Sequence, residues 1–194
     1  TFRRDRGEIE RGRLCRLGVN LYGKTLGILG YGNIGAAVAR RCQAFGMEVL
    51  YNKRTRFSEA QERERGITYA DKDELICRAD VLSLHTPLTP ETRHLIGERE
   101  LAMMKPTAIL INTARGAVVD ELALVQALKE GRIAAAGLDV FEQNDVPSPE
   151  LFTLENVSLT PHIGTQTYDS RVEMVHELCN NVLGFLQGDR KIDR

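Results

Sequence analysis

The stretch "GILGYGNIG", residues 27–35, decides the fold. Its glycines Gly30, Gly32 and Gly35 have the spacing G-x-G-x-x-G and separate an apolar run from an amphipathic one. Between a strand and a helix, the first glycine permits a tight turn and the second lets the backbone approach a pyrophosphate. The third lets the helix pack closely on the sheet. The stretch therefore predicts the first βα unit of a dinucleotide-binding sheet, although a glycine-rich turn without a ligand can have the same spacing.

Apolar strand-like runs alternate with helical ones along the rest of the chain. In residues 33–46 the apolar positions recur every three or four residues, as on one face of a helix. Short apolar strands separated by helices are typical of a parallel sheet covered on both faces. We therefore predict an α/β fold, a doubly wound, Rossmann-like parallel sheet in a three-layer α/β/α arrangement. The predicted strands are 25–30, 47–51, 80–85, 107–114, 133–140 and 156–162, and the predicted helices are 33–46, 120–132 and 167–188.

The charge balance and the cysteines exclude several classes of function. The 194 residues include 26 basic and 27 acidic side chains, which provide no attraction to nucleic acid or to an anionic membrane. The 4 cysteines are widely separated and form no C-x-x-C pair, so neither a zinc site nor a disulfide framework is expected. No apolar run is long enough to span a membrane. We therefore predict no metal, no nucleic-acid partner, no membrane span and a cytoplasmic, reducing location.

Three parts are expected along the chain. Residues 21–165 would form the dinucleotide-binding Rossmann domain. Residues 1–20 would form an interdomain helix region, and residues 166–194 a C-terminal helix and tail, with both helices packing on a neighbouring domain. The chain begins at Thr1 rather than at a methionine, and we expect it to be a piece of a longer protein or a natural chain without one domain.

The residues after the second predicted strand indicate which dinucleotide binds. A site for NAD usually carries an acid there, about 20 residues after the glycine turn, which holds the ribose 2′-hydroxyl. Here the stretch "YNKRTR", residues 51–56, provides Lys53, Arg54 and Arg56 and no acid. A carboxylate would repel a 2′-phosphate, whereas guanidinium groups bind one through charge-assisted hydrogen bonds. The pattern favours NADP over NAD, although a solvated basic loop would have the same composition.

Several motifs, taken together, carry a resemblance to a known family. They are "GKTLGILGYGNIG", "LHTPLTPETRHLIG", "LINTARGAVVDELALVQAL", "GLDVFE" and "PHIGT", in this order. As a set they resemble the cofactor domain of the D-isomer-specific 2-hydroxyacid dehydrogenases, from about residue 21 to residue 188. The stretches "NKRTR" and "PHIGTQTY" are most similar to the glyoxylate/hydroxypyruvate (or 2-ketogluconate) reductase branch. The resemblance implies an NAD(P)-dependent homodimer that reduces short 2-oxo acids such as glyoxylate or hydroxypyruvate.

The same resemblance implies roles for single residues. Arg115 would hold the substrate carboxylate and carbonyl oxygen, His162 would donate a proton, and Asp139 would bind the nicotinamide carboxamide. A fixed fork of donors suits a 2-oxo acid, and imidazole can change its charge near neutral pH. The structural alternatives are a surface cation, a histidine that only follows a proline, and a turn acid. The other residues implied at the cofactor are Asn33, Ile34, Thr86, Pro87, Thr113, Ala114 and Gly164.

The sequence departs from the family at one catalytic position. The family's glutamate lies five residues after the "LDV" aspartate, which here gives Asn144, followed by Asp145. A carboxylate beside His162 would stabilise its imidazolium form, whereas the amide of Asn144 brings no charge. We expect a weaker reductase whose activity is moved to lower pH, unless Asp145 or Glu142 substitutes for the missing acid.

The family also closes a second, substrate-binding lid domain over its site, and nothing in this sequence corresponds to that domain. Closure positions the substrate and excludes water, so this chain alone should bind nucleotide but turn over little. The rival hypothesis is a non-catalytic NAD(P)-binding or dimerisation module. The missing lid and Asn144 favour that rival, whereas Arg115 and His162 oppose it. A different Rossmann enzyme, such as a relative of adenosyl-homocysteine hydrolase, is a more distant alternative.

Overall fold

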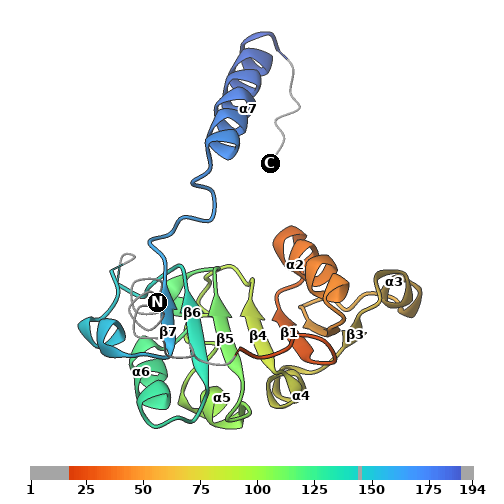
Figure 1. Cartoon of the computed structure of the whole chain (residues 1–194). Coiled ribbons are helices and arrows are strands. Elements are labelled where there is room, and N and C mark those ends of the chain that lie inside the picture. The colour runs from red at the N-terminus through yellow and green to blue at the C-terminus, as the bar shows by residue number, and fades with distance from the viewer. Residues whose placement is uncertain (1–17, 144–145, 189–194) are drawn as a thin grey trace, which may run out of the picture. The chain divides into compact units, whose positions relative to one another are not determined.

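Seven parallel strands form one sheet in the computed structural model of the chain, which describes residues 18–143 and 146–188 (Figure 1). Their order is β3-β2-β1-β4-β5-β6-β7, so the direction of the sequence order reverses between β1 and β4. This is the order of a doubly wound Rossmann sheet, and the predicted fold class is confirmed. The strands are β1 (Thr25–Leu29), β2 (Glu48–Asn52), β3 (Thr68–Tyr69), β4 (Val81–Leu84), β5 (Ile109–Asn112), β6 (Ala135–Leu138) and β7 (Val157–Leu159).

Helices lie on both faces of the sheet because successive strand residues point to opposite sides. Ile28 of β1 belongs to the apolar cluster that contains Ala39 of α2, whereas its neighbour Leu29 belongs to the cluster that contains Leu75 of α4. The second cluster continues under α5 and α6. Parallel strands joined by right-handed crossovers produce this division. The helices are α2 (Asn33–Ala44), α3 (Glu59–Arg65), α4 (Lys72–Arg78), α5 (Glu98–Met103) and α6 (Glu121–Lys129), with short 3-10 turns at Gly116–Val118 and Pro149–Thr153.

The polar stretch after β2 contains two elements that the sequence pattern did not predict, α3 and β3. Ser58 caps α3 by accepting a hydrogen bond from the Gln61 amide, and Gly66 ends the helix with a φ of +61°. Among the residues of α3 only Glu62 is buried. A helix held by its caps and nearly without an apolar face gives no periodic signal, which explains why it was missed.

Residues 163–188 form a unit separate from the sheet domain, and each unit is described by itself. Its helix α7 spans Tyr168–Leu186 and is capped by Thr167, whose hydroxyl accepts a hydrogen bond from the Ser170 amide. Residues 1–17 lie outside the described part, and 18–20 carry neither helix nor strand, so the helix region expected at 1–20 stays a prediction. In the part of the chain that the structure describes, no helix has the length and apolarity needed to cross a membrane.

Candidate cofactor and reaction site

The glycine turn lies where β1 ends and α2 begins, at the point where the strand order reverses. Gly30 has a φ of +94°, and a Cβ there would come within 2.6 Å of the His85 carbonyl carbon, just after β4. A Cβ on Gly35 would come within 2.6 Å of the Gly30 carbonyl oxygen. At Gly32, in contrast, a Cβ would meet no described atom within 4 Å. Packing therefore accounts for Gly30 and Gly35 but not for Gly32, whose open backbone at the start of α2 suits a pyrophosphate.

A cavity of about 540 Å³ opens beside this turn, at the carboxyl ends of β1, β2 and β4. We call it the nucleotide cavity. Leu29 and Leu95 contribute apolar surface, and Lys53, Arg54 and Lys72 contribute positive charge. No acidic side chain is among the described residues that line it. The crevice outside the carboxyl ends of the strands at such a reversal is where open α/β sheets bind their ligands.

Lys53 and Arg54 reach the nucleotide cavity from the end of β2, where an NAD site usually has an acid. The side chain of Asn52, the last residue of the strand, is fixed because its amide nitrogen donates a hydrogen bond to the Ala70 carbonyl at 2.9 Å. Arg54 also lies near Glu91, whose pKa is lowered mainly by a hydrogen bond from Thr89 and partly by the Arg54 charge. Two of the three cations that the sequence assigned to a 2′-phosphate therefore line the nucleotide cavity.

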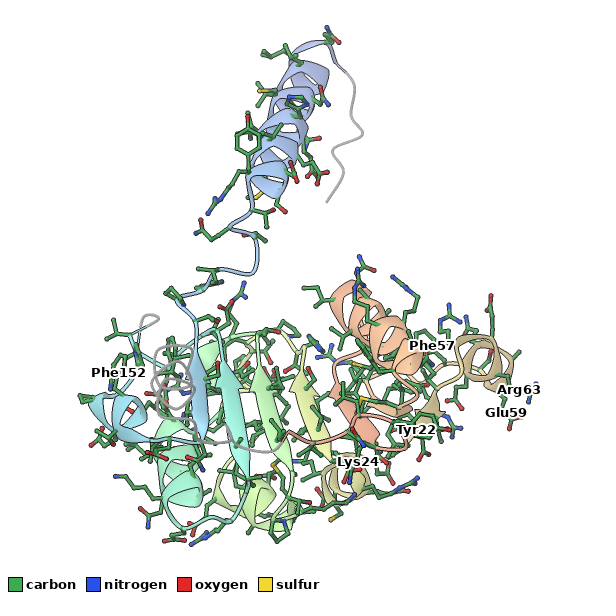
Figure 2. All side chains as sticks on the ribbon, viewed as in Figure 1. Tyr22, Lys24, Phe57, Glu59, Arg63 and Phe152 are labelled. Atoms are coloured by element: carbon green, nitrogen blue, oxygen red, sulfur yellow. The ribbon has the colours of Figure 1, made fainter. Side chains whose placement is uncertain are left out.

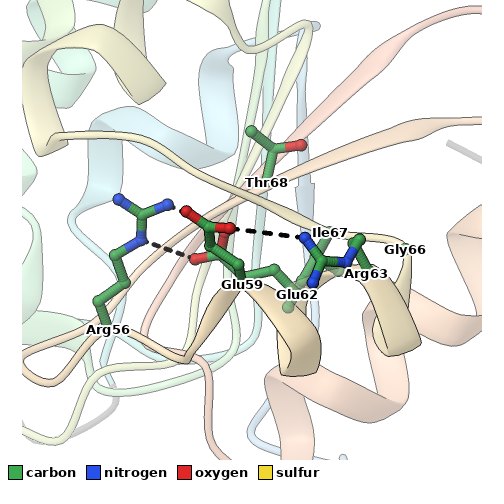
Figure 3. Close-up of a pocket in the computed structure, with 7 residues that line it drawn as sticks. All are labelled: Arg56, Glu59, Glu62, Arg63, Gly66, Ile67 and Thr68. Carbon is green, nitrogen blue, oxygen red and sulfur yellow. Dashed lines mark hydrogen bonds and ion pairs between the residues drawn. The ribbon is translucent and has the colours of Figure 1, made fainter.

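The third assigned cation, Arg56, lies elsewhere. Its Nε and Nη2 donate to the two carboxylate oxygens of Glu62 at 2.8 and 3.0 Å, and it lines a different pocket beside α3 (Figure 3). The same carboxylate accepts the Tyr51 hydroxyl at 2.8 Å. These hydrogen bonds, the one from Arg56 above all, lower the pKa of Glu62. The pairing engages two of the donors with which Arg56 could bind a phosphate.

Aromatic rings support the basic residues around α3. Phe57, labelled in Figure 2, has the Lys53 ammonium 4.0 Å and the Arg65 guanidinium carbon 4.8 Å from its ring centroid. Its ring also meets Tyr31 edge-on at a centroid distance of 5.7 Å. Tyr31 is the residue between the first two glycines of the turn, and burial raises the pKa of its hydroxyl. Contacts of cations with ring faces are attractive, so this cluster restricts where Lys53 can point.

His85 and Thr86 line both the nucleotide cavity and a neighbouring cavity of about 410 Å³. We call the two cavities together the cleft, and these two residues lie in its middle. Burial lowers the pKa of His85, and its Nε2 lies 2.9 Å from the Ser83 hydroxyl oxygen. The hydroxyl oxygen of Thr86 is buried and has no hydrogen-bond partner in the structure. A buried hydroxyl without a partner costs free energy, so a polar ligand that supplied one here would be stabilised.

The second cavity extends to the end of β5 and contains Ile34, Thr113, Ala114 and Arg115. The side chain of Asn112, at the end of β5, fixes this turn. Its amide nitrogen donates to the Arg115 carbonyl at 3.0 Å, and its side-chain oxygen accepts the Ala114 amide at 3.1 Å. Arg115 is exposed and donates to the Ala114 carbonyl at 2.7 Å. The other donors of its guanidinium therefore remain available at the second cavity, which Arg115 lines.

Gly116 packs this turn directly onto the segment that follows β6. A Cβ on Gly116 would come within 1.9 Å of the carbonyl carbon and oxygen of Phe141, and within 2.5 Å of the Glu142 nitrogen. Those atoms are backbone, so a side chain could not displace them cheaply. The turn that carries Arg115 and the segment after β6 therefore form one rigid packing unit.

Asp139 and His162 come together at the ends of β6 and β7. The His162 amide donates to the Asp139 carbonyl at 2.9 Å and to the Thr160 carbonyl at 3.1 Å. The Thr160 hydroxyl donates to the Asp139 carboxylate, which is buried. His162 has a φ of +53°, one of two non-glycine residues with positive φ in the described chain. The structure thus places Arg115, Asp139 and His162 at the same edge of the sheet, after three neighbouring strands.

Glu142 and Glu121 fix the segment after β6. The Glu142 carboxylate accepts from Arg93 at 2.9 Å and lies 2.6 Å from Nε2 of His94. Glu121 accepts the backbone amides of Glu142 at 3.0 Å and Ser148 at 2.8 Å. Glu142 is thus engaged by two partners on the segment after β4.

Asn144 and Asp145 lie outside the described residues, and Gly164 belongs to the separate unit, so their assigned roles stay predictions.

Three features that the sequence pattern did not single out belong to this site: Lys72, Thr160 and Gly116. Lys72 follows β3, which was itself unpredicted, and only the pairing of β2 with β3 brings it to the nucleotide cavity. Thr160 precedes "PHIG" by one residue, so proximity to that motif was the available signal. Gly116 follows Arg115, and nothing in its spacing reveals that Phe141 lies against it.

These observations fit a dinucleotide. The cations of the nucleotide cavity, the open backbone of Gly32 and the unpartnered Thr86 hydroxyl follow one another in this order along the carboxyl edge of the sheet. No cluster of three or more metal-binding side chains occurs in the described part of the chain. Fold and site together define the class, a dinucleotide-binding domain of the Rossmann type.

Comparison with known proteins identifies the family. Residues 3–164 match the family described as D-isomer specific 2-hydroxyacid dehydrogenase, NAD binding domain. The chain belongs to this family, and the predicted resemblance is confirmed.

Relatives whose sequences are about half identical to this chain carry the name glyoxylate reductase. The chain is 54% identical over 176 residues to the one from Thermococcus litoralis, a match that covers 91% of this chain and 53% of that protein. It is 51% identical over 173 residues to the one from Pyrococcus furiosus, covering 89% and 51% respectively. The chain thus spans about half the length of the curated relatives it matches.

Solved structures agree with this assignment. A glyoxylate reductase from Paecilomyes thermophila has a TM-score of 0.84 and 45% identity, with 92% of this chain and 55% of that chain covered. A D-lactate dehydrogenase from Aquifex aeolicus, complexed with NAD and lactic acid, has a TM-score of 0.86 and 34% identity, covering 97% and 62%.

Proposed function

We propose that this chain is the cofactor domain of a reductase that converts short 2-oxo acids, such as glyoxylate or hydroxypyruvate, to 2-hydroxy acids with NADP(H) preferred over NAD(H). The observation that carries the cofactor preference is the nucleotide cavity, which is lined by Lys53, Arg54 and Lys72 and by no acid among the described residues. The names of the relatives, glyoxylate reductase, support the substrate class.

Each end of the cleft has its own task in this proposal. Gly30, Gly32 and Gly35, with Asn33 and Ile34, would form the phosphate turn, and Lys53 and Arg54 would bind the 2′-phosphate. Thr86 and Pro87 would line the middle of the cleft, and the Thr86 hydroxyl would gain its missing partner there. Asp139 would accept a hydrogen bond from the nicotinamide carboxamide.

The reaction end would act on the 2-oxo acid. When bound, the nicotinamide supplies the hydride that reduces the carbonyl carbon. Arg115 would hold the substrate carboxylate and stabilise the charge that develops on the carbonyl oxygen, because its fork of donors matches both groups. His162 would deliver the proton to that oxygen. Thr113 and Ala114, fixed by Asn112, would line the ribose next to the nicotinamide.

A binding titration tests the cofactor assignment. We expect the chain to bind NADPH more tightly than NADH by about tenfold or more, because a 2′-phosphate meets two or three cations. Calorimetry on the whole chain measures both affinities without a substrate. Equal affinities would refute the role given to the basic residues after β2, and no binding of either nucleotide would refute the proposed function altogether.

A second function, a non-catalytic NAD(P)-binding module, is favoured by one observation: position 144, where the family has its catalytic glutamate, is an asparagine. Slow NADPH oxidation with glyoxylate separates the two functions. A reductase domain should show turnover that rises as the pH falls and disappears in Arg115→Ala. Tight NADPH binding without any turnover that depends on Arg115 would favour the module instead.

Homodimerisation and a cytoplasmic location are further parts of the proposal. Phe45, directly after α2, is an exposed apolar side chain that would contribute to a dimer contact. The described cysteines, Cys42, Cys77 and Cys179, are free, which fits a reducing compartment. Sedimentation of the chain at several concentrations would test the dimer.

A further inference from the structure

Lys72 is the cation of the nucleotide cavity for which the sequence offered no role. It is the first residue of α4, whereas Lys53 and Arg54 follow β2. The short strand β3 pairs with β2, and the side-chain amide of Asn52 donates a hydrogen bond to the carbonyl of Ala70, two residues before Lys72. The end of β2 and the start of α4 are thus joined beside one cavity, and both bring positive charge to it.

A buried acid holds Lys72 in place. The Lys72 ammonium lies 2.8 Å from the Glu100 carboxylate, and the two side chains are 33% and 11% exposed. Burial alone would raise the pKa of Glu100, but hydrogen bonds from Lys72 and from the Gly97 amide lower it to about 2. Arg99 also contacts this carboxylate at 2.8 Å, so Glu100 keeps a cationic partner if Lys72 turns toward a ligand.

We propose that Lys72 is a specificity-determining residue for the cofactor, which adds a third positive charge to the pocket for the 2′-phosphorylated adenosine. The inference rests on the proposed function, since it concerns the same cavity. The Phe57 ring restricts where the Lys53 side chain can point, and the negative charge of Glu91 lies near Arg54. Lys72 therefore adds charge to the cavity from a second segment, and a doubly negative phosphate is attracted to that charge more than a hydroxyl is.

The alternative is that Lys72 only fastens α4 to α5 through Glu100. A purely structural role predicts equal changes in the affinity for NADPH and for NADH. A role in specificity predicts that the affinity for NADPH changes while that for NADH stays nearly constant. The ratio of the two affinities therefore separates the alternatives.

The experiment compares Lys72→Met with Lys105→Met by calorimetry on the whole chain. Lys105 is a matched control: its ammonium lies 3.0 Å from Asp80, the side chains are 38% and 17% exposed, and it lines no part of the nucleotide cavity. We expect Lys72→Met to lower the NADPH-to-NADH affinity ratio by about threefold to tenfold, and Lys105→Met to leave it unchanged. Added salt should reduce the difference.

A third variant, Glu100→Gln, keeps the shape of the pair but removes the negative charge. If the charge of Lys72 selects the phosphate, the affinity ratio should not fall in this variant. A fall in both Lys72→Met and Glu100→Gln, or an unchanged ratio in Lys72→Met, would overturn the inference. If the parent chain prefers NADPH and Arg54→Ala removes that preference while Lys72→Met does not, only this inference fails and the proposed function stands.

Discussion

Two glycines in this domain let one backbone segment press against another, one at each end of the cleft. A Cβ on Gly30, at the nucleotide end, would come within 2.6 Å of the His85 backbone, and one on Gly116, at the reaction end, within 1.9 Å of Phe141. Gly30 also needs a positive φ of +94°, whereas Gly116 is excluded from carrying a side chain by proximity alone.

The difference shows how the two ends are encoded. The glycine turn of the nucleotide end is encoded locally, since the end of β1, the turn and the start of α2 lie within residues 27–35. The reaction end is encoded by contact between turns at the ends of β5 and β6, residues 116 and 141. Local encoding makes the glycine turn recognisable from its spacing.

Gly116→Ala is expected to have the largest effect of the changes considered. Because the new methyl group would overlap the Phe141 carbonyl, we expect a loss of about 3 kcal/mol or more in the free energy of unfolding. Urea unfolding measures it. Gly97→Ala serves as the control, since its Cβ would find its nearest contact at 3.7 Å. Equal stability of the two variants would show that the Phe141 backbone does not exclude a side chain at position 116.

Arg54→Ala tests the charge at the nucleotide end. We expect the affinity for NADPH to fall by about thirtyfold with little change for NADH, because charge-assisted hydrogen bonds to a phosphate are lost. Arg56→Ala is the matched variant. Its guanidinium is engaged by Glu62, so a smaller effect on NADPH is expected there. If Arg56→Ala has the larger effect, the assignment of the 2′-phosphate to the nucleotide cavity is wrong.

Gly32→Ala sharpens the contrast between glycines required by packing and those required by a ligand. Its Cβ would meet no described atom within 4 Å, so we expect the free energy of unfolding to change by no more than about 0.5 kcal/mol. Binding of NADPH should nevertheless weaken by about tenfold, since the methyl group would stand where the pyrophosphate approaches. Calorimetry and urea unfolding on the same sample check both halves of this prediction.

Glu100 gives the nucleotide end a dependence on pH. Its pKa is lowered from 4.5 to about 2, so its ion pair contributes stability above pH 4.5 that is lost as the pH falls toward 2. We expect Glu100→Gln to be less stable than the parent by about 1 kcal/mol at neutral pH. The two should converge in urea unfolding as the pH drops through this window. A constant difference across the window would exclude this linkage.

The sequence was sufficient for six of the seven strands of the sheet and for the glycine turn at the nucleotide end. Apolar runs such as 25–30 and 80–85 correspond to β1 and β4, and Gly30 was recognisable by its spacing. It was not sufficient for α3 and β3, which depend on caps and on two backbone pairings. For the same reason it could not distinguish Arg56, paired with Glu62, from its neighbour Arg54 in the cavity.

The left-handed backbone of His162 determines how its chemistry can be tested by substitution. Its amide is bound by two carbonyls, and its φ of +53° is tolerated by asparagine and histidine but costly for β-branched residues. His162→Val would therefore combine a strained backbone with a missing imidazole, and its loss of activity would have two causes. His162→Asn keeps the backbone geometry accessible while removing the imidazole, so it is the substitution that tests the proposed proton transfer without added backbone strain.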